Sequence, residues 1–293
     1  MKRRDGRTGI ENLVVIGTDQ GLVGIVGAML SGSGAAYQGA FRNPLADPYL
    51  LGVAAGAGLG ATVAIVSGWG GRHGALSPVP IAAFVGALGA VVLTYALGGF
   101  GRARSSTSLV LAGVAVASFL TACQTFVQQR NTDVLREVYA WILGRLPVGG
   151  WQEVRAFTPY VLVSCTVLLL SSRMLDVLAV GDTEAGSLGV RVSRVRAVVI
   201  AAASLGAAAA VAVSGLIGFV GIIVPHTVRL LVGGSYRHIV PISLVGGAGF
   251  LVLADLLART VVSPAELPIG VLTAFIGGPF FLLLLRSRRE SLA

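Results

Sequence analysis

Two long apolar runs of this sequence are separated by the polar stretch Arg173-Met-Leu-Asp-Val-Leu-Ala-Val-Gly-Asp-Thr-Glu-Ala-Gly-Ser-Leu-Gly-Val-Arg-Val-Ser-Arg-Val-Arg196. Its local signals predict two short helices that meet at a corner. Gly181 suits the left-handed position that ends the first helix. Asp182 is a candidate cap for the second helix, Glu184 would lie in its positively polarised first turn, and Gly189 would close it.

The second of these helices would carry a small apolar patch. Ala185 and Leu188 are three residues apart, a spacing that places two side chains on one helix face. A compact knob with a charged rim, held between two membrane spans, is suited to contact a protein on the inner side of the membrane. An ordinary loop between spans is the alternative.

The composition indicates a membrane protein. The chain has 293 residues, of which 55% are hydrophobic and 12% are charged, and its mean hydropathy is +0.84. A soluble domain of this length has no interior large enough for so much apolar surface. The net charge of +9 would otherwise suggest nucleic-acid binding. The basic residues, however, lie in short gaps between apolar runs, as the positive-inside rule produces, so we expect a lipid membrane and no nucleic acid as a partner.

The sequence argues against chemistry carried out by this chain. Its one lysine is Lys2, and a Walker-type phosphate loop needs a lysine after its glycines, so this chain has no such loop. If ATP drives transport here, another subunit would bind the nucleotide. Cys123 and Cys165 fall inside apolar runs and belong to no metal-binding motif, so we expect core thiols. The carboxylates are few and dispersed, and no pairing of a nucleophile with a base is present. We therefore expect a chain without catalytic residues, bound metal or bound cofactor.

Nine stretches are apolar enough to cross a hydrocarbon core of roughly 30 Å as helices. They are residues 21–40, 48–68, 78–98, 107–127, 155–172, 197–214, 216–232, 239–258 and 267–285. We therefore predict an all-α polytopic membrane protein with nine transmembrane helices. It would form one transmembrane domain, residues 1–293, with an atypical tail at 1–20 and a cytoplasmic segment at 173–196.

The arginines predict the orientation. On the side of the carboxyl terminus lie twelve, namely Arg42, Arg102, Arg104, Arg173, Arg191, Arg194, Arg196, Arg229, Arg237, Arg286, Arg288 and Arg289, against six on the other side, namely Arg72, Arg130, Arg136, Arg145, Arg155 and Arg259. This bias places the carboxyl terminus in the cytoplasm. The basic residues between Lys2 and Arg7 conflict with an odd number of spans, which would put the amino terminus outside. Either a preceding span is missing, or Met1 is not the natural start.

Glycine and proline patterns predict two packing features. Gly52, Gly56 and Gly60 recur every four residues and would let a neighbouring helix approach closely. Pro225 should kink its helix and free one backbone carbonyl. The adjacent His226 has no acidic or Cys partner nearby in the sequence, which favours a structural role over that of a ligand or proton relay.

Polar residues in two spans are candidate functional groups. Span 107–127 carries hydroxyl and amide side chains that would suit a pathway wall, with helix–helix hydrogen bonding as an equal alternative. These residues are Ser108, Ser118, Thr121, Gln124 and Thr125. Asp255 and Arg259 are four residues apart near the outer end of their span, where they predict either a helical ion pair or a charged rim for a partner.

Several stretches together resemble the FecCD-type permeases of metal-chelate ABC importers, which take up ferric siderophores, haem and cobalamin. They occur in the family's order and spacing from residue 30 to residue 286, and the ordered set is highly specific. The stretches are Gly34-Ala-Ala-Tyr-Gln38, Arg42-Asn-Pro-Leu-Ala-Asp-Pro-Tyr-Leu-Leu-Gly-Val53, Leu111-Ala-Gly-Val114, Trp141-Ile-Leu-Gly144, Gly181-Asp-Thr-Glu-Ala-Gly-Ser-Leu-Gly189, Gly218-Phe-Val-Gly-Ile-Ile-Val-Pro-His-Thr-Val-Arg229, Glu266-Leu-Pro-Ile-Gly-Val-Leu-Thr-Ala274 and Gly278-Pro-Phe-Phe281.

The resemblance implies a homodimer of ten-helix subunits with a pathway between the two copies; a homologous second permease is the alternative to a second copy. Two cytoplasmic ATPase subunits, which would hold ATP and Mg, and an extracytoplasmic binding protein complete such an importer. It also implies site residues. The segment that contacts the ATPase would comprise Asp182, Glu184, Ala185, Ser187, Leu188 and Gly189. The gate and pathway would comprise Asn43, Pro44, Leu45, Ser105, Ser106, Thr107, Ser118, Thr121 and Gln124. Arg259 would contact the binding protein.

The resemblance is incomplete at the front of the chain. Family members carry a full first helix and then an Arg-Leu-Pro-Arg motif, whose arginines also hold the binding protein, before the span that matches 21–40. The corresponding stretch here is Val15-Ile-Gly-Thr-Asp-Gln20. Docking would then rest on Arg259, with Arg136 or Arg145 as further candidates.

The resulting hypothesis is a plasma-membrane permease subunit that imports an iron chelate, with a ferric siderophore as the first candidate and haem or cobalamin as alternatives. ATP-driven closure of the partner subunits would reorient the helices that line the pathway. Two other classes stay open. An ion-driven secondary transporter would need buried acidic residues along its spans, whereas those of this chain lie near span ends or in loops. A truncated, non-transporting paralogue would explain the unusual front.

Overall fold

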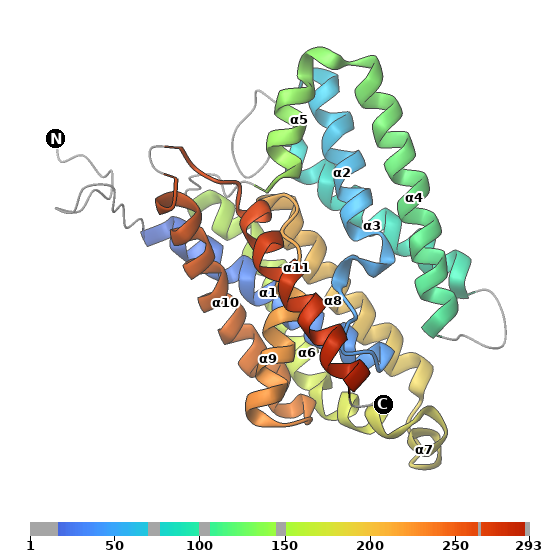
Figure 1. The fold of residues 1–293 in the computed structure, drawn as a ribbon. Coiled ribbons are helices and arrows are strands. Elements are labelled where there is room, and N and C mark those ends of the chain that lie inside the picture. The colour runs from blue at the N-terminus through green and yellow to red at the C-terminus, as the bar shows by residue number, and fades with distance from the viewer. Residues whose placement is uncertain (1–16, 70–76, 100–105, 145–150, 263–264, 291–293) are drawn as a thin grey trace.

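The computed structural model describes residues 17–69, 77–99, 106–144, 151–262 and 265–290, and in these ranges all regular structure is helical (Figure 1). The α-helices are α1 (Gly17–Phe41), α2 (Val53–Ala64), α3 (Pro78–Gly99), α4 (Ser106–Arg130), α5 (Leu135–Ile142), α6 (Trp151–Val180), α7 (Asp182–Ser187), α8 (Val192–Ser214), α9 (Val220–Val232), α10 (Tyr236–Thr260) and α11 (Ile269–Glu290). Short helical turns are η1 (Pro48–Leu51), η2 (Ile65–Trp69) and η3 (Thr132–Val134). The expectations for the basic amino-terminal residues and for Arg145 lie outside the described ranges.

Helix α1 is the centre of the larger helix group. It packs against α6, α8, α9 and α10, and every residue from Met29 to Phe41 is buried. Since protein surrounds this part of the helix, its serines, its glycines from Gly24 onward and Gln38 meet other helices instead of lipid. Small residues at these positions allow the neighbouring backbones to approach closely.

Helices α2, α3 and α4 form a second group, which joins the first through α8 (Figure 1). A Cβ atom added at Gly56 or Gly60 would lie 2.2 Å or 2.1 Å from a backbone oxygen of α3, which confirms the predicted close approach for these two residues. Gly52 behaves differently. It adopts φ +83° between η1 and α2, a left-handed conformation that favours glycine, so it ends a turn and does not extend the packing face.

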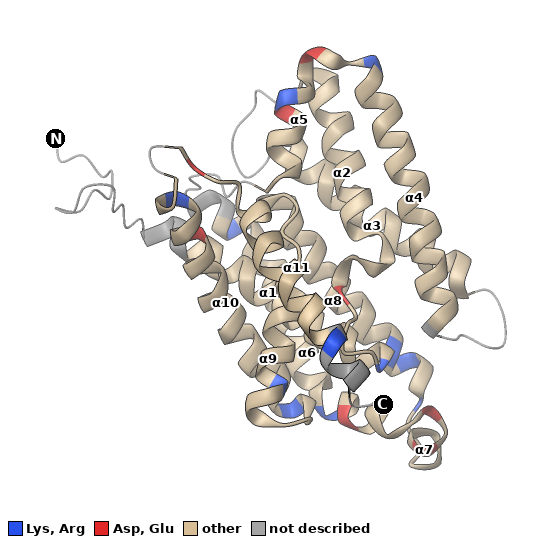
Figure 2. Ribbon diagram, viewed as in Figure 1, with Lys and Arg blue, Asp and Glu red and all other residues tan. Residues whose placement is uncertain are grey.

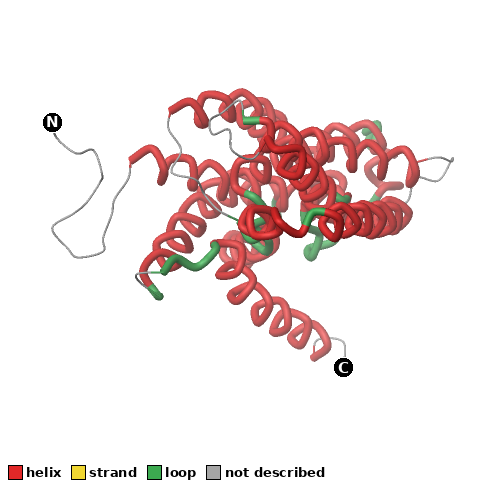
Figure 3. The backbone as a smooth tube through the Cα atoms, turned by 90° about the horizontal axis from the view of Figure 1, so that it is seen from above, coloured by secondary structure: helices red, strands yellow, loops and turns green. Residues whose placement is uncertain are grey.

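The all-α prediction is confirmed, but the count of nine transmembrane helices is not. Within the described residues, five helices have the length and hydropathy needed to cross a membrane, namely α3, α4, α6, α8 and α10. The apolar parts of α2, α9 and α11 are shorter. Seen from above, α11 projects away from the other helices (Figure 3), and it packs against α9 and α10.

Helix α6 is much longer than the predicted span 155–172. It continues without a break to Val180, so residues 173–180 are its last turns and not a separate short helix. The predicted pair of short helices is therefore wrong, and α7 alone is short. The sequence analysis also missed α5, because its eight residues are too few to form a span.

The predicted span 216–232 is also interrupted. Residues 215–219 are not helical, and α9 begins only at Val220, after Phe219 in the left-handed region with φ 68°. Backbone groups inside a membrane protein need partners. The Tyr49 hydroxyl supplies them, since it donates to the Ile217 carbonyl at 2.8 Å and accepts from the Ile217 N–H at 3.3 Å.

Candidate functional site: coupling helix, gate loop and outer pocket

Helix α7 protrudes at one end of the molecule, beyond the end of α6 (Figure 1). It ends as predicted at Gly189, which has φ +81°. The Val190 N–H donates to the Ala185 carbonyl at 3.1 Å and the Gly189 N–H to the Gly186 carbonyl at 3.0 Å, the two bonds of a Schellman motif. Gly181 differs from the prediction. Its φ of 150° and ψ of 156° are outside the left-handed helical region, and it serves as the N-cap of α7.

Asp182 does not cap α7, which corrects the prediction. It is the first residue of the helix, and its carboxylate binds two arginines. The Arg196 Nη2 lies 2.8 Å from Oδ1 and 3.1 Å from Oδ2, and the Arg42 Nη2 lies 3.3 Å from Oδ1. A carboxylate at a helix N-terminus is also favoured by the helix dipole. Asp182 therefore joins α7 to α8 and to the residue that follows α1.

The predicted apolar face of α7 is split between two environments. Ala185 is fully buried within the chain, whereas the side chain of Leu188 is 70% exposed. Ala185 therefore anchors α7 and is not available to a partner, contrary to its predicted role. Glu184, Ser187 and Gly189 are exposed, as contact with another protein requires. The exposed surface of α7 and of the residue after it thus combines two carboxylates, two hydroxyls and one large apolar side chain.

The end of α6 is tied to the start of α10 by Asp176, which the sequence reading did not single out. The Asp176 carboxylate accepts hydrogen bonds from the Ser235 hydroxyl at 2.8 Å and from the backbone N–H groups of Tyr236 and Arg237. It therefore caps α10 from a different helix. The same end of the molecule carries α7 and a gathering of basic residues (Figure 2).

The predicted gate loop, residues 42–47, begins where α1 ends. Arg42 adopts φ 51°, and the Asn43 N–H donates to the Gln38 carbonyl at 3.0 Å while the Arg42 N–H donates to the Gly39 carbonyl at 3.2 Å, again a Schellman motif. The Asn43 side chain then accepts a hydrogen bond from the Leu45 N–H at 3.0 Å, which fixes a tight turn.

The predicted gate residues differ in their exposure to solvent. Asn43 is exposed, and Pro44 and Leu45 are half-buried. Thr107 is exposed at the start of α4. Ser105 lies outside the described residues, and Ser106 is described only as the first residue of the α4 backbone. The loop leads into η1, which packs against α4.

Asp47 closes the gate loop and caps η1. Its carboxylate accepts a hydrogen bond from the Tyr49 N–H at 2.8 Å. Burial raises the pKa of the Asp47 carboxyl to about 6, and the hydrogen bond from the backbone opposes that rise. The carboxylate therefore ionises near neutral pH and links the loop to the turn that holds Tyr49.

Helix α4 separates its predicted pathway residues into two groups. Ser118 and Thr121 are exposed, together with large apolar side chains such as Phe119 and Phe126. Gln124 is buried, and its side-chain oxygen would lie 2.8 Å from a Cβ atom added at Gly58 of α2. Helix–helix packing therefore explains Gln124, while Ser118 and Thr121 are free to face a pathway.

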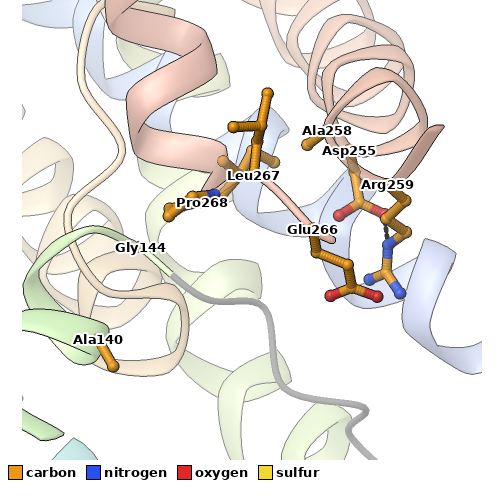
Figure 4. A pocket seen from close by; sticks show the side chains of 9 residues that line it. Ala140, Gly144, Asp255, Ala258, Arg259, Glu266, Leu267 and Pro268 are labelled. Carbon is orange, nitrogen blue, oxygen red and sulfur yellow. Dashed lines mark hydrogen bonds and ion pairs between the residues drawn. The ribbon is translucent and has the colours of Figure 1, made fainter. Parts of the chain in front are cut away.

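At the opposite end from α7, a cavity of about 260 Å³ lies among α5, α10 and the start of α11 (Figure 4). Asp255, Arg259 and Glu266 line it. The Arg259 Nε lies 2.9 Å from the Asp255 Oδ2, so the predicted ion pair is confirmed. Arg259 thus lines this cavity beside two carboxylates.

His226 is buried, with its ring edge-on to that of Phe280 at a centroid distance of 5.8 Å. This aromatic packing is consistent with the structural role favoured from the sequence. Within the described residues, no cluster of three His, Cys, Asp or Glu side chains suits a metal ion.

Comparison with known proteins adds independent information. Residues 21–287 match the model of the FecCD transport family. The chain is 43% identical over 263 residues to the cobalamin import system permease protein BtuC of Halobacterium salinarum, covering 90% of this chain and 70% of the relative. It is 38% identical over 275 residues to the hemin transport system permease protein HmuU of Yersinia pestis, covering 91% and 80%. Among solved structures, an inward-facing ABC transporter assigned to the metal-chelate type shares 31% identity and a TM-score of 0.83, covering 92% of this chain and 85% of that chain.

Proposed function

Since this chain belongs to the FecCD transport family, we propose that it is the membrane permease subunit of an ABC importer for metal chelates. The match over residues 21–287 carries this proposal, because it spans the gate loop, α7 and the outer pocket together. The relatives named above are permeases, so the function is transport and not catalysis. An ion-driven secondary transporter has no support from these relatives.

The proposed mechanism is alternating access driven by a separate ATPase. Two cytoplasmic ATPase subunits would bind ATP and Mg. They would contact exposed residues of α7 and of the turn that follows it, namely Asp182, Glu184, Ser187, Leu188 and Gly189. The basic residues gathered at the same end support a cytoplasmic position for α7 and for the carboxyl terminus in the plasma membrane (Figure 2). Closure of the ATPase dimer would displace α7 and open or close the gate loop.

A second permease copy would complete the pathway. In the most apolar 18-residue stretch of α4, 17% is buried within the chain, against 72% in the corresponding stretch of α8. Its exposed face carries Ser118 and Thr121 beside Leu111 and Val114, a mixture of weakly polar and apolar groups that suits a pathway next to a subunit contact better than lipid alone. Helix α11 likewise exposes Phe275 and Leu282. A homologous permease in place of a second copy would use the same faces.

On the outer side, an extracytoplasmic binding protein would dock near the cavity that Arg259 lines. Arg259 is 23% exposed and already faces Asp255, so an acidic group of the partner would share the guanidinium with that carboxylate. We propose a ferric siderophore as the substrate to test first, with haem and cobalamin as alternatives. The small hydroxyl side chains on α4 offer little chemical discrimination, so the binding protein would select the chelate.

The test is isolation of the complex from its own cells through a carboxyl-terminal tag, followed by native mass spectrometry and uptake assays in proteoliposomes. The expected complex holds two permeases and two ATPase subunits, and it accumulates the chelate only with its binding protein and hydrolysable ATP. Ferric siderophore, haem and cobalamin are assayed side by side. A chain that purifies without an ATPase, or uptake that follows an ion gradient in the absence of ATP, would refute the proposal.

A further inference from the structure

A buried arginine joins α7, the proposed coupling helix, to the carboxyl end of α1. Arg196 lies in the first turns of α8 and is 7% exposed. Its Nε donates to the Ala40 carbonyl of α1 at 2.9 Å, while its Nη2 donates to the Asp182 carboxylate of α7 at 2.8 Å. One guanidinium, carried by α8, therefore binds both α1 and α7.

The Ala40 carbonyl needs a donor from outside its helix. Within a helix, the carbonyl of residue 40 would accept from the N–H of residue 44. That residue is Pro44, which has no N–H. The two Schellman bonds at this helix end go to the carbonyls of Gln38 and Gly39. Arg196 thus supplies the missing donor, and its positive charge is favoured at a helix C-terminus.

The other ion pair that holds α7 is weaker. The second ion pair of Asp182, with Arg42, joins two side chains that are 41% and 43% exposed, and water screens such pairs. The backbone on either side of α7 passes through Gly181 and Gly189, both with positive φ. Arg196, by contrast, is buried and binds both the Ala40 carbonyl and the Asp182 carboxylate through charge-assisted hydrogen bonds.

We propose that Arg196 is the positioning residue that transmits displacement of α7 to the gate loop. The gate loop starts at Arg42, two residues after the carbonyl that Arg196 binds, so movement of Asp182 toward or away from the membrane shifts the end of α1 with it. Loss of either contact would let α7 move with the ATPase while the gate loop stays in place. This inference rests on the proposed function, since it requires an ATPase that moves α7.

The experiment uses the complete importer and compares its ATP-free form with its vanadate-trapped form by hydrogen–deuterium exchange. In the native complex, trapping is expected to alter amide exchange in residues 182–190 and in residues 41–47. In Arg196→Gln, the change at 182–190 is expected to persist and the change at 41–47 to disappear. Uptake per ATP hydrolysed is expected to fall about five- to ten-fold, the size of a typical coupling between two sites. Arg194→Gln, an exposed arginine of the same helix, is the matched control and should behave as the native complex.

Asp182→Asn provides a second test, because it weakens the ion pairs of Asp182 with Arg196 and Arg42 and leaves the Ala40 contact intact. In this variant too, trapping is expected to leave amide exchange at 41–47 unchanged. The variant also keeps the test possible if Arg196→Gln does not assemble. An unaltered response of residues 41–47 in either assembled variant would overturn the inference, as would a native complex in which only residues 182–190 respond. A native complex that binds an ATPase without any response at 182–190 would instead overturn the proposed coupling itself.

Discussion

The side-chain amide of Gln38 donates to the Gly221 carbonyl at 3.2 Å, and this carbonyl is the one that Pro225 leaves without a helical donor. The sequence predicted a freed carbonyl, and the structure identifies its partner. The same amide accepts a hydrogen bond from Arg229 at 3.3 Å, and Arg229 donates to the Tyr236 hydroxyl at 3.0 Å. The turn of α9 that contains Pro225 is therefore bound to both α1 and α10.

The Gln38→Leu variant tests this contact. It leaves the buried Gly221 carbonyl without a partner, so we expect the complex to lose about 1–3 kcal/mol of stability. Thermal unfolding in detergent measures the loss. Gln129→Leu, which removes an exposed amide on α4, is the control and should leave the melting temperature nearly unchanged. Equal melting temperatures for the two variants would contradict the role of the hydrogen bond.

Close packing of α1 on α9 depends on Gly34. A Cβ atom there would lie 2.1 Å from the Gly221 oxygen, so the backbones must separate in Gly34→Ala. We expect a cost of about 1–3 kcal/mol or more, as for overpacked cores, and lower yields of assembled complex. Gly21→Ala on the same helix meets no atom within 4 Å and should be neutral. Native-like melting of Gly34→Ala would show that the two helices can separate freely.

The capping of α10 by Asp176 predicts a stability effect at the α7 end. Asp176→Ala removes the acceptor for Ser235 and for the first N–H groups of α10, and we expect a loss of about 1–2 kcal/mol, the usual value for a helix cap. Asp176→Asn, which keeps one oxygen, should lose less. Asp133→Ala, at an exposed position of η3, is the control. The order of the three melting temperatures is the measurement, and a loss in Asp133→Ala equal to that in Asp176→Ala would argue against the cap.

Asp47 predicts a pH dependence. Its pKa rises from 3.8 to about 6 in the fold, so the folded chain binds more protons than the unfolded chain between these values. The contribution of the carboxyl is therefore full below about pH 3.8 and is lost as the pH rises through 6. Asp47→Asn keeps an acceptor and cannot ionise, so its melting temperature relative to the native chain should rise between pH 4 and pH 7 and then level off. Parallel profiles would exclude this titration.

The two environments on α4 predict different reactivities. In a chain whose Cys123 and Cys165 have been replaced, Ser118→Cys should react with a water-soluble thiol reagent in the assembled importer, because thiolates form where water reaches. Gln124→Cys should be protected, since Gln124 is buried against α2. Labelling followed by mass spectrometry compares the two rates. Equal rates would mean that Ser118 does not face an aqueous pathway.

Local sequence signals predicted the features that depend on neighbouring residues. The long apolar runs gave the helices, Gly189 ended α7, and the spacing of Asp255 and Arg259 gave their ion pair. Hydropathy misjudged the ends of helices at two places. The polar residues after Leu170 hid the continuation of α6 to Val180, and the apolar residues 215–219 hid a break, because a buried non-helical turn is as apolar as a helix.

The sequence by itself determined that this chain is an all-helical membrane protein of the permease type, since hydrophobicity, charge bias and motif order are properties of the linear chain. The tertiary structure decided which polar groups act together. Asp182 and Arg196 are fourteen residues apart and Gln38 and Gly221 are 183 residues apart, so no local spacing identifies either pair. Tertiary packing also turned Ala185 inward and left Leu188 exposed. The physical reason is that a buried carbonyl or charge takes its partner from whichever helix packs beside it, and that choice follows from the fold as a whole.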